Sequence, residues 1–258
     1  MTVEVLISCM HLNSVDDVME LVKRTNIQGA CTVVSQCEKD AVVKIGDIQI
    51  IFTTERGLSR SRNMAIRNAT GDICLVCDDD EILYDNYEKI ILDGYSELSD
   101  GDIIAFKVIS QANCNKPRAK QELKLKGILK TSSVEISFKR QQIIDNNIHF
   151  DVEMGSGTGH GAGEENKFLM DCRRAGLKLY CHTNIIGQLL PNEHTNWNRE
   201  YNKEYFYYHG WAARRILGAF LSSAYIIYYV GAKHHMYKGK ISVWNAFLAE
   251  FSGWFHAK

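Results

Sequence analysis

Ile73-Cys74-Leu75-Val76-Cys77-Asp78-Asp79-Asp80 is the stretch that decides the fold. Residues 73–77 are all apolar and predict a buried β-strand, and the three carboxylates follow it at once. Like charges at one strand end repel each other, and each carboxylate resists transfer out of water. A divalent cation would offset both costs, and carboxylate oxygens suit Mg²⁺ or Mn²⁺. The plainer alternative is a solvated acidic turn that caps the following helix.

Strands and helices alternate on both sides of this stretch. Apolar runs predict strands at 3–9, 30–34, 48–52, 102–110, 133–138 and 177–181, and helical spacing predicts helices at 15–24, 59–68, 84–98 and 164–175. This alternation favours an α/β fold with a mainly parallel central sheet flanked by helices. Ligands of such sheets lie beyond the carboxyl ends of the strands, where Ser8 and Gln36 fall together with the aspartates.

Composition narrows the class of protein. The chain has 258 residues, 45% of them hydrophobic, and a formal net charge of −1, which argues against a general nucleic-acid binder. Eight cysteines are scattered, and the pair Cys74 and Cys77 would point to opposite faces of a strand. We therefore expect buried reduced thiols and a cytoplasmic protein, since the N-terminus shows no secretory signal pattern.

The C-terminal quarter differs from the rest. From Thr195 onward there are eight Lys or Arg against three Asp or Glu, a balance of +5, and 17 of the 26 aromatic residues. Residues 216–232 carry no charge, which is at the lower limit for a membrane span. We expect a catalytic domain over 1–195 and a helical region over 196–258. An interfacial helix on the inner face of the cell membrane is favoured over internal packing, and both over a spanning helix.

Four motifs, taken together, resemble the family 2 glycosyltransferases of the GT-A fold. They are the helix start Arg56-Gly57-Leu58-Ser59-Arg60-Ser61-Arg62-Asn63, the turn Ala69-Thr70-Gly71-Asp72, the strand end Asp78-Asp79-Asp80, and the glycine-rich run 155–163 that leads into Glu164-Glu165. Their order and spacing match the family over roughly residues 3–195. The resemblance implies transfer of a sugar from a nucleotide-diphosphate donor.

The resemblance also implies roles on the donor side. Asp78 and Asp80 match the family's Asp-x-Asp pair. Asp78 would contact the ribose side of the donor and share the metal, Asp80 would hold the metal, and Asp79 would lie beside the donor. A late histidine, His194, is a candidate third metal ligand. Further donor contacts are expected from Arg60, Arg62 and Asn63 near the diphosphate, although Arg62 could instead pair with Asp78 or Asp79 to stabilise the fold. Gln36 replaces the family's acidic base contact, and its amide could meet a uracil edge.

On the acceptor side, the resemblance points to Glu165 as the base that deprotonates the attacking hydroxyl. Glutamate replaces the family's usual aspartate here, so Glu164 stays an alternative base or an acceptor contact. Both are also favourable first-turn acids. His160, in the glycine-rich run, could touch the acceptor or the phosphates.

We therefore expect an inverting, metal-dependent glycosyltransferase that uses a UDP-sugar and a saccharide acceptor, with a lipid-linked oligosaccharide as the expected form. Two other classes stay open. A sugar-1-phosphate nucleotidyltransferase would usually have a glycine-rich basic loop after the first strand, where this chain has Ser8-Cys9-Met10-His11. The second open class is a non-catalytic sugar-binding scaffold of the same fold.

Overall fold

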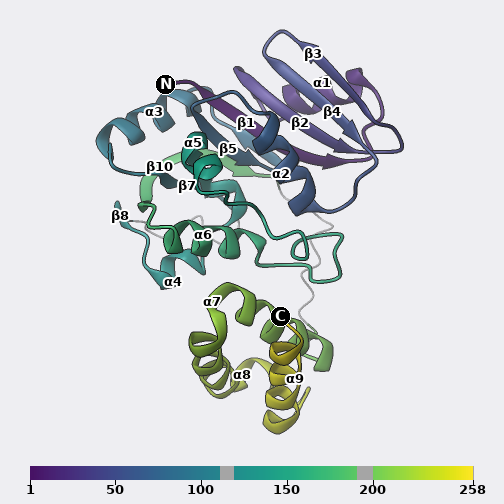
Figure 1. Cartoon of the computed structure of the whole chain (residues 1–258), viewed down its shortest axis with the longest axis vertical. Coiled ribbons are helices and arrows are strands. Elements are labelled where there is room, and N and C mark those ends of the chain that lie inside the picture. The colour runs from purple at the N-terminus through teal and green to yellow at the C-terminus, as the bar shows by residue number, and fades with distance from the viewer. Residues whose placement is uncertain (111–118, 191–199, 258) are drawn as a thin grey trace.

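The structure is a computed structural model that describes residues 1–110, 119–190 and 200–257. The first two ranges form a mixed sheet with helices on both faces (Figure 1). The strands are β1 (Val3–Met10), β2 (Ala30–Gln36), β3 (Ala41–Ile45), β4 (Ile48–Thr53), β5 (Ile73–Cys77), β6 (Glu81–Leu83), β7 (Ile103–Ile109), β8 (Gln121–Glu122), β9 (Ile136–Lys139) and β10 (Leu179–Leu189). The helices of this part are α1 (Val15–Arg24), α2 (Leu58–Asn68), α3 (Tyr87–Glu97), α4 (Leu125–Ile128), α5 (Arg140–Asp145) and α6 (Glu164–Arg174), with a short 3₁₀ turn at Ser133–Glu135.

The strand order is β3-β4-β2-β1-β5-β9-β7-β10-β6, and β8 pairs with β10. The strands β4, β2, β1 and β5 are parallel, so their carboxyl ends meet at one edge of the sheet. β9 runs antiparallel to both of its neighbours, and β3, β6 and β8 are antiparallel to theirs. The α/β fold with a central sheet flanked by helices is confirmed, and the sheet is mixed.

Each face of the sheet has its own hydrophobic core. On one face α1 and α3 bury side chains such as Val18 and Tyr95, and on the other α2 and α6 bury side chains such as Ile66 and Phe168. Cys74 lies in one core and Cys77 in the other, as the strand spacing predicts. The described cysteines are all free and buried, so this C-x-x-C spacing does not form a site.

Local sequence signals explain how the elements begin. Ser14 caps α1: its hydroxyl accepts a hydrogen bond from the Asp17 amide, and the Asp17 carboxylate accepts one from the Ser14 amide, both at 3.1 Å. The turn before β5 needs glycine at Gly71, because a Cβ there would lie 2.6 Å from the Cβ of Glu4. The buried Glu4 carboxylate accepts bonds from the Thr70 and Gly71 amides, each at 2.7 Å.

Several predicted boundaries were wrong. The strand expected at 133–138 begins with a 3₁₀ turn, and β8 and α4, which precede it, were not expected. The strand expected at 177–181 extends to Leu189, because its second half pairs with β6 and β7. The edge strand β3 and the short β6 were not predicted.

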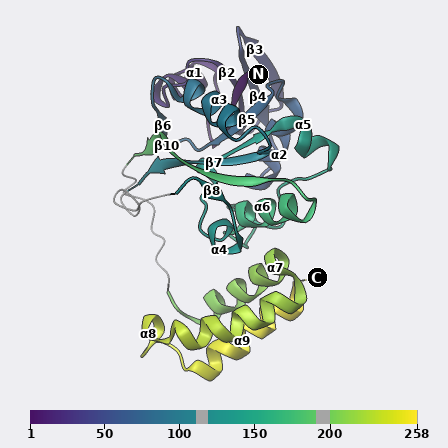
Figure 2. The same ribbon diagram turned by 90° about the vertical axis from the view of Figure 1, so that its left-hand side faces the viewer.

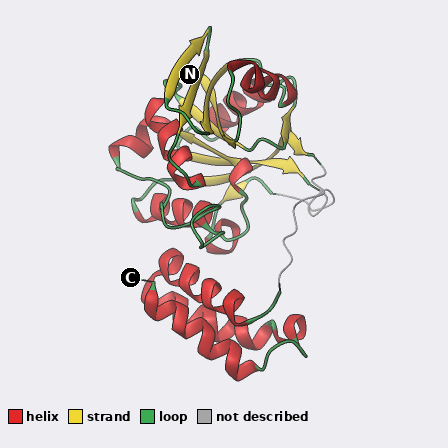
Figure 3. Ribbon diagram, turned by 90° about the vertical axis from the view of Figure 1, so that its right-hand side faces the viewer, coloured by secondary structure: helices red, strands yellow, loops and turns green. Residues whose placement is uncertain are grey.

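The C-terminal region consists of α7 (Lys203–Ala232), α8 (His234–Tyr237) and α9 (Val243–His256), which lie beneath the sheet domain (Figures 1 and 2). α7 is not straight, because Gly218 has φ 75° and ψ 177°. The hydroxyls of Tyr205 and Tyr229 are 2.7 Å apart, whereas 24 residues of straight helix would separate them by about 36 Å. The chain therefore reverses at Gly218, so segments 203–217 and 219–232 run antiparallel and pack side by side. The helices of the C-terminal region lie alongside one another in Figure 3.

This reversal bears on whether α7 could cross a membrane. α7 as a whole is long and apolar enough to cross a bilayer by length and composition. Its two segments, however, are each about 21–23 Å long at 1.5 Å per residue, shorter than the roughly 30 Å of hydrocarbon that a span must cross. The helical character expected for the C-terminal extension is confirmed. The boundary at residue 195 lies outside the described residues and stays a prediction.

Candidate active site

The three aspartates lie at the edge where the parallel strands end. Asp78 follows β5 directly, and its Oδ1 lies 2.9 Å from Arg62 Nη2 while its Oδ2 accepts a 3.4 Å hydrogen bond from Ser133. The main-chain carbonyl of Asp79 accepts a bond from Arg24 at 3.0 Å, and that of Asp80 accepts one from the Leu190 amide at 2.8 Å. The acidic turn is thus fixed by its backbone.

The electrostatics of this turn favour a cation. The pKa of Asp79 is raised because protein atoms displace part of its water and because Asp80 and Asp78 lie beside it. The next residue, Glu81, is fully buried, and neither of its carboxylate oxygens has a hydrogen-bond partner among the described residues. Burial and the nearby Asp78 raise the pKa of Glu81 well above its usual range. This concentration of carboxyl groups is costly without a compensating positive charge.

Within the described residues, no group of three or more metal-ligating side chains is arranged around a common point. Mg²⁺ commonly binds through one or two carboxylates and completes its shell with substrate phosphates and water. Asp78 and Asp80 fit this pattern and would hold the ion together with a diphosphate. His194, the third candidate ligand, lies outside the described residues.

Arg62 joins the donor side to the acceptor side. Its side chain is 3% exposed, and its guanidinium lies 2.9 Å from Asp78 Oδ1 and 2.9 Å from Glu164 Oε1. Burial alone would lower the pKa of Arg62, but the carboxylates of Asp78 and Glu164 outweigh it and raise the pKa. The Arg62 guanidinium already pairs with two carboxylates. The geometry therefore favours a fold-stabilising role for Arg62 over a direct contact with the donor.

We expect the substitution Arg62→Met to lower the free energy of unfolding by roughly 3–5 kcal/mol, because it leaves a buried carboxylate without its partner. Urea denaturation at pH 7 measures this loss. The matched control is Arg60→Met on the same helix, where the side chain is exposed and a change within about 0.5 kcal/mol is expected. Equal losses in the two variants would contradict the bridging role.

Glu164 and Glu165 begin α6, directly after Gly163, whose φ of 97° favours glycine. Glu164 is buried and pairs with Arg62. Glu165 is partly buried, and the pKa of its carboxyl is raised to about 8 by desolvation and by the adjacent Glu164. A carboxylate whose pKa lies near the working pH is suited to general-base catalysis. Of the pair, Glu165 is therefore the better candidate base.

The glycine-rich run lies against the start of α2. Ser59 Oγ donates to the Met154 carbonyl at 2.7 Å, and the Leu58 amide donates to the Ser156 carbonyl at 3.1 Å. Asn63 bonds the backbone of Phe150 through both its amide nitrogen and its oxygen, each at 2.8 Å. Asn63 thereby holds the segment that leads to the candidate base. This structural role differs from the donor contact expected for Asn63.

Gln36 also has partners within the protein. Its side chain is buried, its oxygen accepts a 2.7 Å bond from the Gly57 amide, and its nitrogen lies 3.4 Å from Ser61 Oγ. The geometry favours a role in holding the Gly57 turn over contact with a uracil edge. Two other expected donor contacts are differently placed: Ser8 Oγ is buried without a partner among the described residues, and Arg60 is exposed on the first turn of α2.

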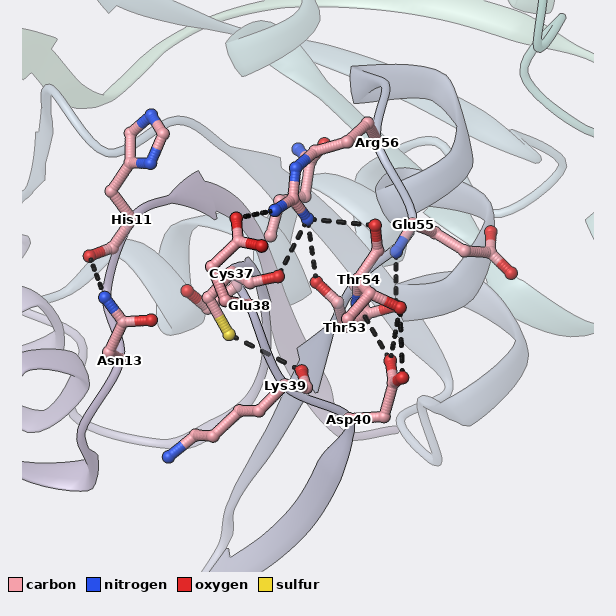
Figure 4. A network of polar contacts seen from close by, with 12 residues as sticks. His11, Asn13, Cys37, Glu38, Lys39, Asp40, Thr53, Thr54, Glu55 and Arg56 are labelled. Atoms are coloured by element: carbon pink, nitrogen blue, oxygen red, sulfur yellow. Dashed lines mark hydrogen bonds and ion pairs between the residues drawn. The ribbon is translucent and has the colours of Figure 1, made fainter.

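The carboxyl ends of β2 and β4 are tied together by Arg56 (Figure 4). Its guanidinium donates to the carbonyls of Cys37, Thr53 and Thr54 at 2.8–3.2 Å and pairs with Glu38. Asp40 completes the network by accepting bonds from Thr54. The loops beyond these strands are therefore fixed on the side where the nucleotide base is expected.

The C-terminal helices contact the other end of the site. His160 stacks on Trp211 with ring centroids 3.8 Å apart, and Arg215 pairs with Asp151 at 2.8 Å. Trp211 and Arg215 thus pack the start of the C-terminal region against the catalytic domain, and Ile216, the first residue of the uncharged run 216–232, lies against Gly163. The Nδ1 atom of His160 lies 3.1 Å from the Glu153 carbonyl oxygen, so this ring nitrogen already has a partner within the protein.

Sequence reasoning missed several residues that shape this site. Arg24, Ser133 and Trp211 lie far from the motifs along the chain, and no local pattern distinguishes them. The pairing of Arg62 with Asp78 was an open alternative, and its second partner, Glu164, was not foreseen.

Comparison with solved structures agrees with this architecture. A crystal structure of S. aureus TarS residues 1–349 in complex with UDP-GlcNAc matches with a TM-score of 0.65 at 16% identity, covering 100% of this chain and 79% of TarS 1–349. The mannosyltransferase PcManGT from Pyrobaculum calidifontis, solved with GDP-Man and Mn²⁺, matches with a TM-score of 0.52 at 13% identity, covering 98% of this chain and 86% of its own. At these identities the matches show the fold alone.

Sequence comparison gives the family. No curated protein sequence matches the chain significantly. The profile described as "Glycosyl transferase family 2" matches residues 32–162, a little over half of the chain, and this range contains the α2 motif, the turn at Gly71 and the three aspartates. The chain belongs to the family 2 glycosyltransferases and has the GT-A fold.

Proposed function

We propose that this glycosyltransferase moves a sugar from a UDP-sugar to a saccharide acceptor with inversion at the anomeric carbon. The observation that carries the proposal is the Asp78–Arg62–Glu164 bridge, which holds the acidic turn and the candidate base in one site. UDP is preferred as the nucleotide because TarS, solved with UDP-GlcNAc and with UDP, has a similar fold.

Mg²⁺ or Mn²⁺ would be held by Asp78 and Asp80, and would supply Lewis-acid stabilisation of the charge on the departing diphosphate. The exposed Arg60 is placed to add a charge-assisted contact to the same phosphates. Ser8 Oγ, which is buried and has no hydrogen-bond partner in the described part of the chain, is suited to donate a hydrogen bond to the nucleotide. The raised pKa of Asp79 supports a site that gains stability when a cation neutralises it.

Glu165 would accept the proton of the acceptor hydroxyl as its oxygen attacks the anomeric carbon. Glu164 would stay paired with Arg62 and keep the start of α6 in place. Attack from the face opposite the diphosphate inverts the configuration. The acceptor is proposed to be a lipid-linked oligosaccharide, which requires the enzyme to work at the inner surface of the cell membrane.

The C-terminal helices offer support for that location. Large apolar side chains project from them into solvent, with exposed fractions between 59% and 85% for Phe220, Ile227, Tyr228, Trp244 and Phe255. Lysines and histidines lie between α7 and α9 along the chain. Aromatic side chains together with cations favour the interface of an anionic bilayer. The protein would then be cytoplasmic and peripherally bound.

A thermal-shift panel of nucleotide sugars, with and without Mn²⁺, tests the proposal. We expect UDP-sugars to raise the melting temperature in the presence of Mn²⁺, because a ligand that binds only the folded form stabilises it. At 100 times the dissociation constant the gain is about 2.7 kcal/mol, or roughly 5–10 °C for a chain of this size. A larger response to GDP-sugars would identify GDP instead of UDP as the donor nucleotide. No response to any nucleotide sugar would favour a non-catalytic scaffold.

A further inference from the structure

Asn166, the residue directly after the candidate base, connects α6 to a turn on the other side of the site. Its side-chain nitrogen donates to the carbonyls of Ile128 and Thr131, at 3.0 Å and 3.3 Å. Ile128 is the last residue of α4, and Thr131 lies in the turn that follows it. Asn166 therefore fixes the turn after α4 against the first turn of α6.

The turn after α4 continues directly to the acidic turn at the end of β5. Two residues after Thr131, the hydroxyl of Ser133 donates to Asp78 Oδ2 at 3.4 Å. A capping pair fixes the 3₁₀ turn at this point, because the Ser132 amide donates to Glu135 Oε2 at 3.1 Å. The segment between α6 and the acidic turn is therefore held at both of its ends.

The Arg62 bridge ends on the other oxygen of the same carboxylate. Arg62 lies 2.9 Å from both Asp78 Oδ1 and Glu164 Oε1. Ser133 contacts Asp78 Oδ2 instead. Two separate connections thus run from the start of α6 to Asp78, one from the residue before Glu165 and one from the residue after it.

These connections lie on either side of the candidate base. Successive residues of an α-helix are about 100° apart around its axis, so Glu165 lies between Glu164 and Asn166. Fixing both neighbours limits how far the backbone of Glu165 can move relative to Asp78. Burial and the Glu164 charge raise the pKa of Glu165, and the charge of Arg62 opposes them, so Glu165 is within electrostatic reach of the bridge.

A transfer reaction depends on this spacing. The acceptor hydroxyl must lie between the base and the anomeric carbon, while the donor is held at the acidic turn. A misplacement of about 1 Å can lower the rate about 100-fold. A single link would let α6 pivot about one contact, whereas two links to one carboxylate restrict that rotation.

We infer that Asn166 and Ser133 are positioning residues, which set the distance between Glu165 and a donor held at Asp78. The inference rests on the proposed function, because it takes Glu165 as the base. Asn166 acts on the base through the start of α6 and on the acidic turn through segment 128–133. Its loss should therefore slow transfer without weakening donor binding.

Turnover of Asn166→Leu at saturating donor and acceptor tests the positioning role. Leucine has a similar size but cannot donate hydrogen bonds, so we expect kcat to fall about tenfold or more. The affinity for a UDP-sugar, measured by calorimetry with Mn²⁺, should stay within about twofold. Asn166→Gln keeps the amide and should recover part of the lost turnover. Thermal melting shows whether each variant is folded at the assay temperature.

Asn146→Leu is the matched control. The Asn146 side chain donates to the Gln142 carbonyl at 2.9 Å, so it also holds the end of a helix. That helix, α5, begins beside Asp72, at the opposite end of β5 from Asp78. The control makes the same chemical change away from the site, and its turnover should stay within about twofold of the wild type.

A double-mutant cycle tests whether Ser133 and Asn166 belong to one connection. Ser133→Ala alone should lower kcat about threefold or more, and adding it to Asn166→Leu should cause at most about a further twofold loss. Hydrogen exchange on the full chain tests the connection without substrate. Asn166→Leu should speed exchange of the amides in segment 129–135 by roughly threefold or more, and Asn146→Leu should not.

The outcomes separate this inference from the proposed function. Wild-type turnover in Asn166→Leu, or a loss of donor affinity as large as the loss of turnover, would overturn the positioning role and leave the transferase in place. Losses that multiply in the double variant, or unchanged hydrogen exchange in Asn166→Leu, would overturn the connection itself. A wild type that responds to no nucleotide sugar would remove the proposed function, and the positioning role with it.

Discussion

Glu165→Gln is expected to lower turnover by roughly 100-fold or more while donor affinity stays within about twofold. The amide keeps the shape of the side chain but cannot accept the acceptor proton. Donor binding is measured by calorimetry with Mn²⁺, and turnover by release of UDP from a UDP-sugar in the presence of acceptor. Unchanged turnover would assign the base to another residue, with Glu164 tested next.

The raised pKa of Glu165 gives this variant a pH signature. The base must be ionised, so the wild-type rate should rise with pH up to about 8 and then level off, and Glu165→Gln should lose this limb. Stability should behave in the opposite sense. A carboxyl whose folded pKa is raised destabilises the fold as pH increases from its unfolded value near 4.5 to about 8. The variant should therefore melt no lower than the wild type at pH 8, which also shows that it is folded.

Asp80→Ala is expected to abolish the metal-dependent part of transfer and of donor hydrolysis, because it removes one of the carboxylates proposed to hold the ion at the diphosphate. Activity is measured across a Mn²⁺ titration. Asp80→Asn is the matched variant: it preserves size and should retain the fold but not the response to metal.

The control for this pair is Asp72→Asn, at an exposed carboxylate that contacts Thr2 and precedes β5, at the opposite end of that strand from the three aspartates. It should keep the wild-type dependence on Mn²⁺. Full activity of Asp80→Ala at saturating donor would remove the metal role of this residue, and the ion would have to be held elsewhere.

The fold was predictable from sequence because its signals are local. The apolar run before Asp78, the capping pair Ser14 and Asp17, and the glycine required beside Glu4 each fix a nearby element. The missed strand β3 is short, and its sequence Ala41-Val42-Val43-Lys44-Ile45 is largely apolar although most of the strand is exposed at the edge of the sheet. Its two-residue connection to β4, Gly46-Asp47, was a hairpin signal that could have revealed it.

The site was predictable in residue identity but less so in role. Arg62, Asn63 and Gln36 stand at the positions that the family motif marks, yet each has its main partners inside the protein. Those partners, such as Phe150, are brought together only by the fold. The reversal at Gly218 was equally hidden, since a single glycine in an apolar run is compatible with a continuous helix.

The stacking of His160 on Trp211 and the pairing of Arg215 with Asp151 have a consequence for engineering. The C-terminal helices cannot be exchanged independently of the catalytic domain, because they pack against the loop that precedes Glu165. A chimaera that exchanges residues 200–257 for those of a relative would also need the segment equivalent to 149–163 from that same relative.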